Sequence, residues 1–322
     1  MIAAAAGLAA AGLAAAAITT SGTSPLGHGH PASRPPATRA ALTSPFTGEP
    51  VQRLTRVLIA KIDNLAPARP QTGLAGADII YVLPVEGGLS RLMAVFSSHF
   101  PPVIGPVRSS REDDIALLRQ FGRPAFAYSG AAPRLLPLVR RARTVDLYAG
   151  VAGGYYRDPA KLAPHNLYAR TRALLAEARG ASTARDIGFR FGPAPPGGRA
   201  AARRSVSYPA ASFAFRWSAA EGRWLVSMDG SPAASAGGGR LSAATVVIQR
   251  TIVRPSRFHP AGGVSPYAQT TGSGTAVVLR DGQSWQARWS RPLADGGTTF
   301  TTASGRPMTF ARGPVWIVLI SR

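Results

Sequence analysis

Residues 78–85 read DIIYVLPV, and Glu86-Gly87-Gly88 follows them directly. The run is short, apolar and rich in β-branched side chains, which favours a buried strand. Two similar runs lie at Val57–Ile62 and Leu92–Phe96, and each ends in polar or glycine residues. The paired glycines predict a tight turn from one strand into the next. This part of the chain therefore predicts a sheet.

Helices are expected in the same half of the sequence. Ser110 precedes Arg111-Glu112-Asp113-Asp114, and apolar residues continue at helical spacing as far as Phe121. A polar cap followed by acidic residues in the first turn is typical of a helix N-terminus. A second helix is predicted from Thr171 to Arg179, because a glycine follows it directly.

The second half of the sequence favours strands almost throughout. Phe213, Phe215 and Trp217 alternate with other residues, and Asp281-Gly282 between two apolar runs predicts a hairpin. We therefore predict an α+β fold. A layered sheet-and-helix domain over residues 44–192 is followed by a hinge rich in proline and glycine at 193–203, and a mostly β domain covers 204–322.

The first residues favour export. Residues 2–18 form an uncharged run of Ala, Leu, Gly and Ile, so 1–18 is predicted to be a signal peptide or membrane anchor. Residues 19–43 are rich in Ser, Thr, Pro and Gly and are predicted to be a flexible linker. We expect an extracytoplasmic protein. It is secreted or held on the outer face of the cytoplasmic membrane, and it contacts the membrane only through this segment.

The charge balance and the absence of cysteine limit the partners, metals and cofactors that the sequence predicts. The 322 residues carry 37 basic and 15 acidic side chains, and all of the basic ones except Lys61 and Lys161 are arginines. This excess favours a general attraction to polyanions. The arginines are spread along the chain, so no specific nucleic-acid partner is predicted. The absence of cysteine excludes thiolate metal sites and disulfides, and with no diagnostic ligand spacing or nucleotide fingerprint we predict no metal and no cofactor.

Several ordered segments carry a family resemblance. In the first half they include Ser44–Gly48, Asp63-Asn64, Ala68–Leu74, Val85–Gly88, Gly105–Ser109, Tyr156-Arg157 and Pro164–Tyr168. In the second half they include Val246–Gln249, Gly272–Gly274, Asp281-Gly282, Trp289 and Trp316. From about Ser44 onward the chain resembles the YerB-like family of bacterial envelope proteins, which are often lipoproteins. The resemblance implies a layered α+β first domain, a β-rich second domain and an extracytoplasmic location, and it implies no known activity.

The chain departs from the pattern of that family in two ways. The family usually has a lipobox cysteine, and this sequence contains no cysteine, so no lipidation is expected. Within Trp224–Ser235 the family typically offers Arg, His and Asp, whereas Val226, Ala233 and Ser235 stand here. Thr245 likewise occupies a position that is usually Asn. We therefore expect the functional site in the first domain.

Polar residues in the first half are the candidate site. They are expected at strand ends and helix starts, where binding groups collect, and arginine forks suit carboxylate, phosphate or sugar-acid ligands. One interpretation is a ligand site, and an equally weighted one is an internal arginine–carboxylate network that fixes turns. The candidate ligand-binding residues are Asp63, Asn64, Arg69, Arg91, Arg108, Ser109, Arg111, Arg157 and Asn166.

Two residues are candidates for acid–base chemistry. His165 lies in Pro-His-Asn, histidine is the residue type best suited to acid–base chemistry near neutral pH, and Glu86 or Asp158 could orient it or act as its acidic partner. The leading hypothesis is an envelope-associated binding protein that engages an anionic or sugar-containing component of the cell wall, or an envelope protein. The alternative is a hydrolase of wall glycan that uses Glu86 and His165. The sequence leaves open whether the protein is an enzyme.

Overall fold

A mixed sheet of eleven strands dominates the computed structural model, which describes residues 42–260 and 263–322. Strands from both halves of the sequence share this sheet, and the described residues group into one compact unit. The order across the sheet is β11 (Arg199–Ala200), β21 (Gln283–Arg291), β20 (Gly272–Arg280), β17 (Thr245–Thr251), β23 (Val315–Ser321), β4 (Ile79–Pro84), β5 (Ser90–Phe96), β3 (Leu58–Asp63), β7 (Ala125–Tyr128) and β8 (Val145–Tyr148), with β22 (Thr299–Thr302) paired to β21.

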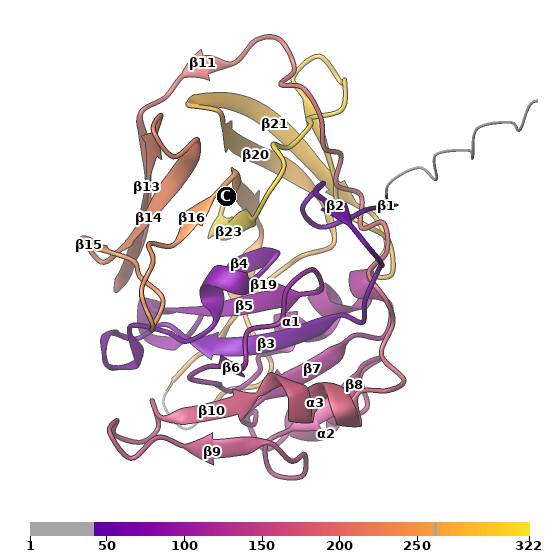
Figure 1. Ribbon diagram of the computed structural model, residues 1–322, viewed down its shortest axis with the longest axis vertical. Coiled ribbons are helices and arrows are strands. Elements are labelled where there is room, and N and C mark those ends of the chain that lie inside the picture. The colour runs from indigo at the N-terminus through magenta and orange to yellow at the C-terminus, as the bar shows by residue number, and fades with distance from the viewer. Residues whose placement is uncertain (1–41, 261–262) are drawn as a thin grey trace, which may run out of the picture. The chain divides into compact units, whose positions relative to one another are not determined.

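The two halves of the sequence meet at β23. This strand lies between β17 and β4 and runs parallel to both. Figure 1 shows it in yellow beside the purple β4. Parallel strands that are covered on both faces need a continuous apolar sequence, and residues 315–319 are all buried.

The central strands are buried on both faces. Every residue of β3, β4 and β5 is buried. Leu58, Ala60 and Ile62 pack into one hydrophobic core, and Val57 and Ile59 pack into the other. The alternation follows from the period of two along a strand. The sheet is therefore the middle layer between two cores.

A smaller sheet covers one of these cores. It consists of β12 (Arg203–Tyr208), β13 (Ala211–Ser218), β14 (Arg223–Met228) and β15 (Ser231–Pro232), with β16 (Ser242–Ala243) paired to β14. The Trp316 ring of β23 lies 6.5 Å from the ring of Phe213 and 6.1 Å from that of Phe215, between ring centroids. The alternation of aromatic residues predicted for β13 is confirmed, because Phe213 and Phe215 are fully buried.

Helices are few and short in the part of the chain that the structure describes. The α-helices are α1 (Glu112–Leu118), α2 (Leu136–Arg140) and α3 (Thr171–Glu177), and the 3-10 turns are η1 (Ala66–Ala68), η2 (Leu74–Gly76), η3 (Glu86–Gly88) and η4 (Arg119–Phe121). The remaining small sheets pair β1 (Leu42–Thr43) with β2 (Pro50–Val51), β10 (Leu167–Arg170) with β6 (Val103–Ile104) and β9 (Tyr155–Arg157), and β18 (Val253–Pro255) with β19 (Pro266–Ala268). The fold is thus nearer to mostly β than to the predicted α+β class. The connections between strands are mainly irregular segments and 3-10 turns.

Two predicted turns and two predicted helices are confirmed. Asp281 and Gly282 have φ angles of 47° and 68° and join β20 to β21. The η3 turn joins β4 to β5, and a Cβ atom on Gly88 would lie 2.6 Å from Pro209 Cβ. Glycine is therefore required there both by its positive φ of 70° and by the close approach of Pro209. The helices α1 and α3 occupy the predicted segments.

The predicted hinge lies within the described residues, whereas most of the predicted N-terminal segments lie outside them. In segment 193–203, Arg199 pairs with Ser284 of β21, so this segment adds a short strand to the edge of the large sheet. The predicted signal peptide or anchor at 1–18 lies outside the described residues, as does the linker up to residue 41. Within 42–260 and 263–322, no helix combines the length and apolar character needed to cross a membrane.

Candidate functional site

The site is built where the parallel strands β3 and β7 end. The segment 105–109 lies between these two strand ends: the Arg108 amide donates to Lys61 O (2.8 Å), and the Arg108 carbonyl accepts from Ser129 N (3.0 Å). Both contacts fix the backbone beside Ser109. The carboxyl ends of parallel strands are where open sheets commonly hold ligands.

Asp63 is the last residue of β3 and is fully buried. Its Oδ2 atom lies 2.8 Å from His165 Nδ1 and 3.0 Å from Arg108 Nε, while its Oδ1 accepts from Leu65 N at 3.2 Å. The partner of His165 is therefore Asp63, and not Glu86 or Asp158 as the sequence suggested. Because Nδ1 is held by the carboxylate, the chemistry open to this half-buried ring is at Nε2.

Glu86 lies on the η3 turn and forms a forked ion pair with Arg111. Arg111 Nε donates to Oε1 at 2.6 Å and Nη2 donates to Oε2 at 2.7 Å. Burial alone would raise the pKa of this carboxyl. The hydrogen bonds and charge of Arg111 outweigh burial and lower the pKa to about 2. Glu86 is consequently an ionised structural partner at neutral pH and has no proton to donate.

Arg91 on β5 lies directly opposite Asp63 in the antiparallel pair with β3. Its Nη1 donates to Ser109 O at 3.1 Å, and Arg111 Nη1 donates to the same carbonyl at 3.3 Å. Burial, together with the nearby charges of Arg111 and Arg108, lowers the pKa of Arg91 to about 9, and the carboxylates of Glu86 and Asp63 offset this only in part. The guanidinium of Arg91 thus lies in a strongly positive environment.

We call Arg91, Arg108 and Arg111, with Glu86 and Asp63, the arginine cluster. It contains three guanidinium groups and two carboxylates, so it has a surplus of positive charge. The buried Nε atoms of Arg91 and Arg108 have no hydrogen-bond acceptor within the described residues, although Arg108 Nε is in ion-pair contact with Asp63. Across 42–260 and 263–322, the Nη atoms of Arg108 also make no hydrogen bond, and its side chain is 18% exposed.

The serines at this strand end do not form a catalytic pair with His165. Ser109 Oγ lies 3.4 Å from Ser129 Oγ, and the ring of His165 is held instead by Asp63. Hydrogen bonding from a serine to a general base is the arrangement that activates a hydroxyl nucleophile. Within the described part of the chain, neither serine has such a partner.

Four predicted site residues take part in contacts outside the arginine cluster. Asn64 donates to Ser90 Oγ (2.9 Å), and Arg69 pairs with Asp229 Oδ2 (2.8 Å) on the turn after β14. The Arg69 pair ties the first half of the sequence to the second. Arg157 and Asn166 form a separate pair, in which Arg157 Nη1 donates to Asn166 Oδ1 at 2.7 Å.

No cluster of three or more His, Asp or Glu side chains suited to a metal ion occurs among the residues that the structure describes. The arginine cluster offers three guanidinium groups and two ion-paired carboxylates, and the imidazole of His165 contacts one of these carboxylates. Guanidinium groups bind carboxylates and phosphates through paired hydrogen bonds.

Two models of one protein family match this chain. A family described as "Protein of unknown function (DUF3048) N-terminal domain" matches residues 46–184, and the corresponding "C-terminal domain" matches residues 204–317. The chain belongs to the DUF3048 family. All the candidate site residues of this DUF3048 protein lie within the N-terminal match.

The chain is also similar to the YerB protein of Bacillus subtilis, both in sequence and in structure. "Putative lipoprotein YerB" of strain 168 is 38% identical over 101 residues, which are 30% of this chain and 30% of that protein. The match thus spans about a third of the relative. The crystal structure of the YerB protein from Bacillus subtilis has a TM-score of 0.73 at 20% identity, and the match covers 87% of this chain and 97% of that chain. The DUF3048 protein therefore shares the fold of YerB.

The positions at which departures from the family pattern are expected make structural contacts in this DUF3048 protein. Val226 is fully buried in the core beneath the small sheet. Ser235 pairs through its backbone with Gln71, and the hydroxyl of Thr245 accepts from Ala311 N at 2.9 Å. These side chains contribute packing and backbone contacts.

One buried polar cluster of this DUF3048 protein was missed by the sequence analysis. Lys61 and Asp114 form an ion pair of 2.6 Å with both side chains fully buried, and Asp113 is buried beside them. Burial and the charge of Asp114 raise the pKa of Asp113. A lysine inside the apolar run of β3 was the signal that could have revealed the cluster, because a buried lysine requires a counter-charge.

Proposed function

We propose that this protein is an extracytoplasmic, envelope-associated binding protein, and that its arginine cluster binds an anionic group of a cell-wall polymer or of an envelope protein. The description of YerB as a putative lipoprotein supports an extracytoplasmic location. The apolar run at residues 2–18 supports the same location. The proposed membrane contact is limited to that N-terminal segment.

The surplus of positive charge in the arginine cluster carries this proposal. The Glu86–Arg111 fork neutralises one arginine, and Asp63 offsets the charge of another while it also holds His165. One guanidinium therefore remains without a carboxylate of its own. Burying cations without counter-charges is unfavourable, so a ligand anion would stabilise this arrangement.

A purely structural network is the competing explanation. It accounts well for the Glu86–Arg111 fork, in which each of the three guanidinium nitrogens of Arg111 donates to at least one acceptor. It accounts less well for Arg108, whose Nη atoms lie at the partly exposed edge of the cluster with no acceptor among the described residues. Arg108 is accordingly the residue that separates the two explanations.

Binding to isolated wall sacculi across a salt series tests the proposal. We expect the protein to be retained at low salt and released as salt rises, because the contact is electrostatic. Arg108→Ala should weaken retention about fivefold or more at low salt, which corresponds to loss of about 1 kcal/mol. The matched control is Arg288→Ala, which removes the same charge from an exposed strand position. Equal retention of the two variants would contradict the proposal.

A second candidate function, hydrolysis of a wall polymer, is supported by the Asp63–His165 contact. A buried carboxylate that orients an imidazole leaves the other ring nitrogen available as a general base. Glu86 does not suit the acid of such a pair, because Arg111 lowers its pKa to about 2. The hydrolase alternative thus depends on His165.

The same incubations test hydrolysis. Soluble fragments released from the sacculi would be analysed by mass spectrometry for the wild type and for His165→Gln. Fragments that appear with the wild type and disappear with the variant would favour the enzyme, provided that the variant is still retained by sacculi. Retention without fragments would favour the binding protein.

A further inference from the structure

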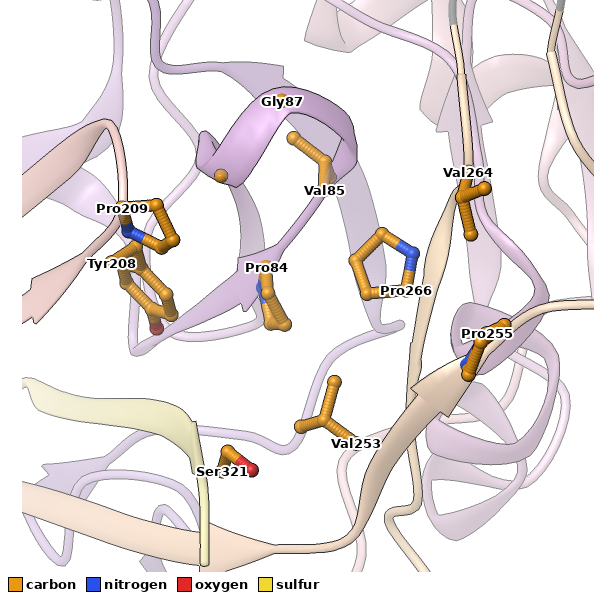
Figure 2. A pocket seen from close by; sticks show the side chains of 11 residues that line it. Pro84, Val85, Gly87, Tyr208, Pro209, Val253, Pro255, Val264, Pro266 and Ser321 are labelled. Carbon is orange, nitrogen blue, oxygen red and sulfur yellow. The ribbon is translucent and has the colours of Figure 1, made fainter.

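An apolar pocket of about 360 Å³ opens at the η3 turn, where Val85 and Gly87, the two sequence neighbours of Glu86, line it. Figure 2 shows Pro84 and Val85, at the end of β4, facing Val253 and Pro266 from β18 and β19, with Tyr208 at one side. The volume lies within the range of small-molecule sites in proteins. The pocket draws its walls from both halves of the sequence.

The side chains of the pocket favour an apolar occupant. Prolines and valines form most of its lining, and the hydroxyl of Tyr208 donates to Leu319 O at 2.7 Å and is thus already used. Ser321 adds one hydroxyl at the edge. A methylene group needs about the volume of a water molecule, roughly 30 Å³, so the pocket of about 360 Å³ has room for about twelve methylene groups.

One rim of the pocket is continuous with the arginine cluster. Val85 and Gly87 line the pocket, and Glu86 between them forms the fork with Arg111. Arg111 and Arg91 then share the carbonyl of Ser109 as acceptor. The guanidinium of Arg111 is therefore bound directly to the η3 turn, which forms one wall of the pocket.

A second contact connects the opposite rim to the same helix start. Pro255 lines the pocket, and the hydroxyl of the next residue, Ser256, donates to Glu112 Oε2 at 2.6 Å. Glu112 follows Arg111 in the sequence. Two separate segments of the pocket rim thus contact residues 111 and 112 at the start of α1, which connects the pocket to the arginine cluster from two sides.

We infer that the ligand is a single amphiphile, whose aliphatic chain occupies the pocket and whose anionic headgroup binds the arginine cluster at Arg91 and Arg108. The inference rests on the proposed function and names the class of ligand. Charge complementarity selects an anionic headgroup, since the cluster has three guanidinium groups for two carboxylates. The apolar lining selects an aliphatic chain rather than a sugar, which would need hydrogen-bond partners in the pocket.

Binding of monomeric alkyl phosphates to the full-length protein, measured by calorimetry, tests the inference. The series runs from inorganic phosphate through butyl and hexyl to octyl phosphate, with octanol as the neutral comparison. Each added methylene should improve the dissociation constant about three- to fourfold while the pocket has room. Octanol should bind more weakly than octyl phosphate by tenfold or more.

Two variants separate the contributions of chain and headgroup. Ser321→Trp places a large side chain at the exposed edge of the pocket, and Thr275→Trp is its control at an exposed strand position outside the pocket. Ser321→Trp should abolish the dependence of the dissociation constant on alkyl chain length and leave binding of inorganic phosphate intact. Thr275→Trp should change neither. Arg108→Ala should weaken octyl phosphate about tenfold and leave octanol unchanged.

The outcomes distinguish failure of the inference from failure of the proposed function. If phosphate binds and depends on Arg108 but chain length has no effect, the pocket inference is wrong and the binding function stands. If no phosphate binds and octanol equals octyl phosphate, the proposed anion site is wrong as well. Binding only to anionic vesicles, and not to monomeric alkyl phosphates, would also overturn the inference.

Discussion

The pH dependence of folding stability provides a sharp test of the buried carboxyl at the start of β4. Asp78 is 3% exposed, and its Oδ2 atom accepts from Ser97 N (2.6 Å) and Ser98 N (2.9 Å). Burial raises its pKa from 3.8 to about 6, against the opposing effect of these hydrogen bonds. The proposed change is Asp78→Asn, which keeps an oxygen for both donors and removes the titration.

The direction and the size of the stability change caused by Asp78 follow from proton linkage. Because the folded state holds the proton more tightly than the unfolded state, the stability contributed by protonation is fully present below pH 3.8 and is lost as the pH rises to about 6. A shift of about two pH units corresponds to about 3 kcal/mol, which is an upper bound. The wild type should therefore lose stability relative to Asp78→Asn by up to about 3 kcal/mol from pH 4 to pH 7.

Urea unfolding followed by tryptophan fluorescence at several pH values measures this difference, since Trp224, Trp289 and Trp316 are buried. The control is Asp186→Asn at an exposed carboxylate, whose pKa is lowered by its hydrogen bond to Arg190. For this control, the wild type should gain stability relative to Asp186→Asn as the pH rises out of the acidic range. The sign is opposite to that for Asp78, because a lowered pKa means that the ionised carboxylate stabilises the folded state. A difference between wild type and Asp78→Asn that stays constant from pH 4 to pH 7 would refute the reasoning.

Two further predictions concern the η3 turn. Glu86→Gln removes the counter-charge of the buried Arg111 and should lower the free energy of unfolding by about 2–3 kcal/mol in urea titrations; an unchanged urea midpoint would exclude a stabilising fork. Gly88→Ala should lower it by about 2 kcal/mol or more, because the new Cβ would lie 2.6 Å from Pro209 Cβ at a positive φ. Gly222→Ala is the control, as its positive φ of 57° faces open space, and it should cost about 1 kcal/mol. Equal losses in the two glycine variants would contradict the role given to Pro209.

Local signals in the sequence predicted the local parts of this fold. The acidic first turn of α1, the apolar runs of β3, β4 and β5, and the Asp281-Gly282 hairpin are all set by neighbours within a few residues. Backbone propensity, capping and turn chemistry act over that range. These elements therefore appear where the sequence placed them.

The strand order depends on contacts that no local pattern contains. The apolar run of β23 predicts a buried strand, but not its insertion beside β4, which lies more than two hundred positions earlier. The site shows the same limit. The sequence identified Asp63 and His165 separately, and only the fold brings them to 2.8 Å. The pairing of Lys61 with Asp114 is a third contact of this kind.

The central position of β23 has a consequence for the order in which the protein can be completed during synthesis. Residues 315–321 pair on one side with β17 and on the other with β4. A nascent chain that has not yet released these residues from the ribosome leaves both neighbours with unpaired backbone groups along one edge. Such edges recruit other strands, so this interval is when the chain most needs a chaperone. The hydrophobic centre of the molecule is thus closed by a strand that emerges after both of its neighbours.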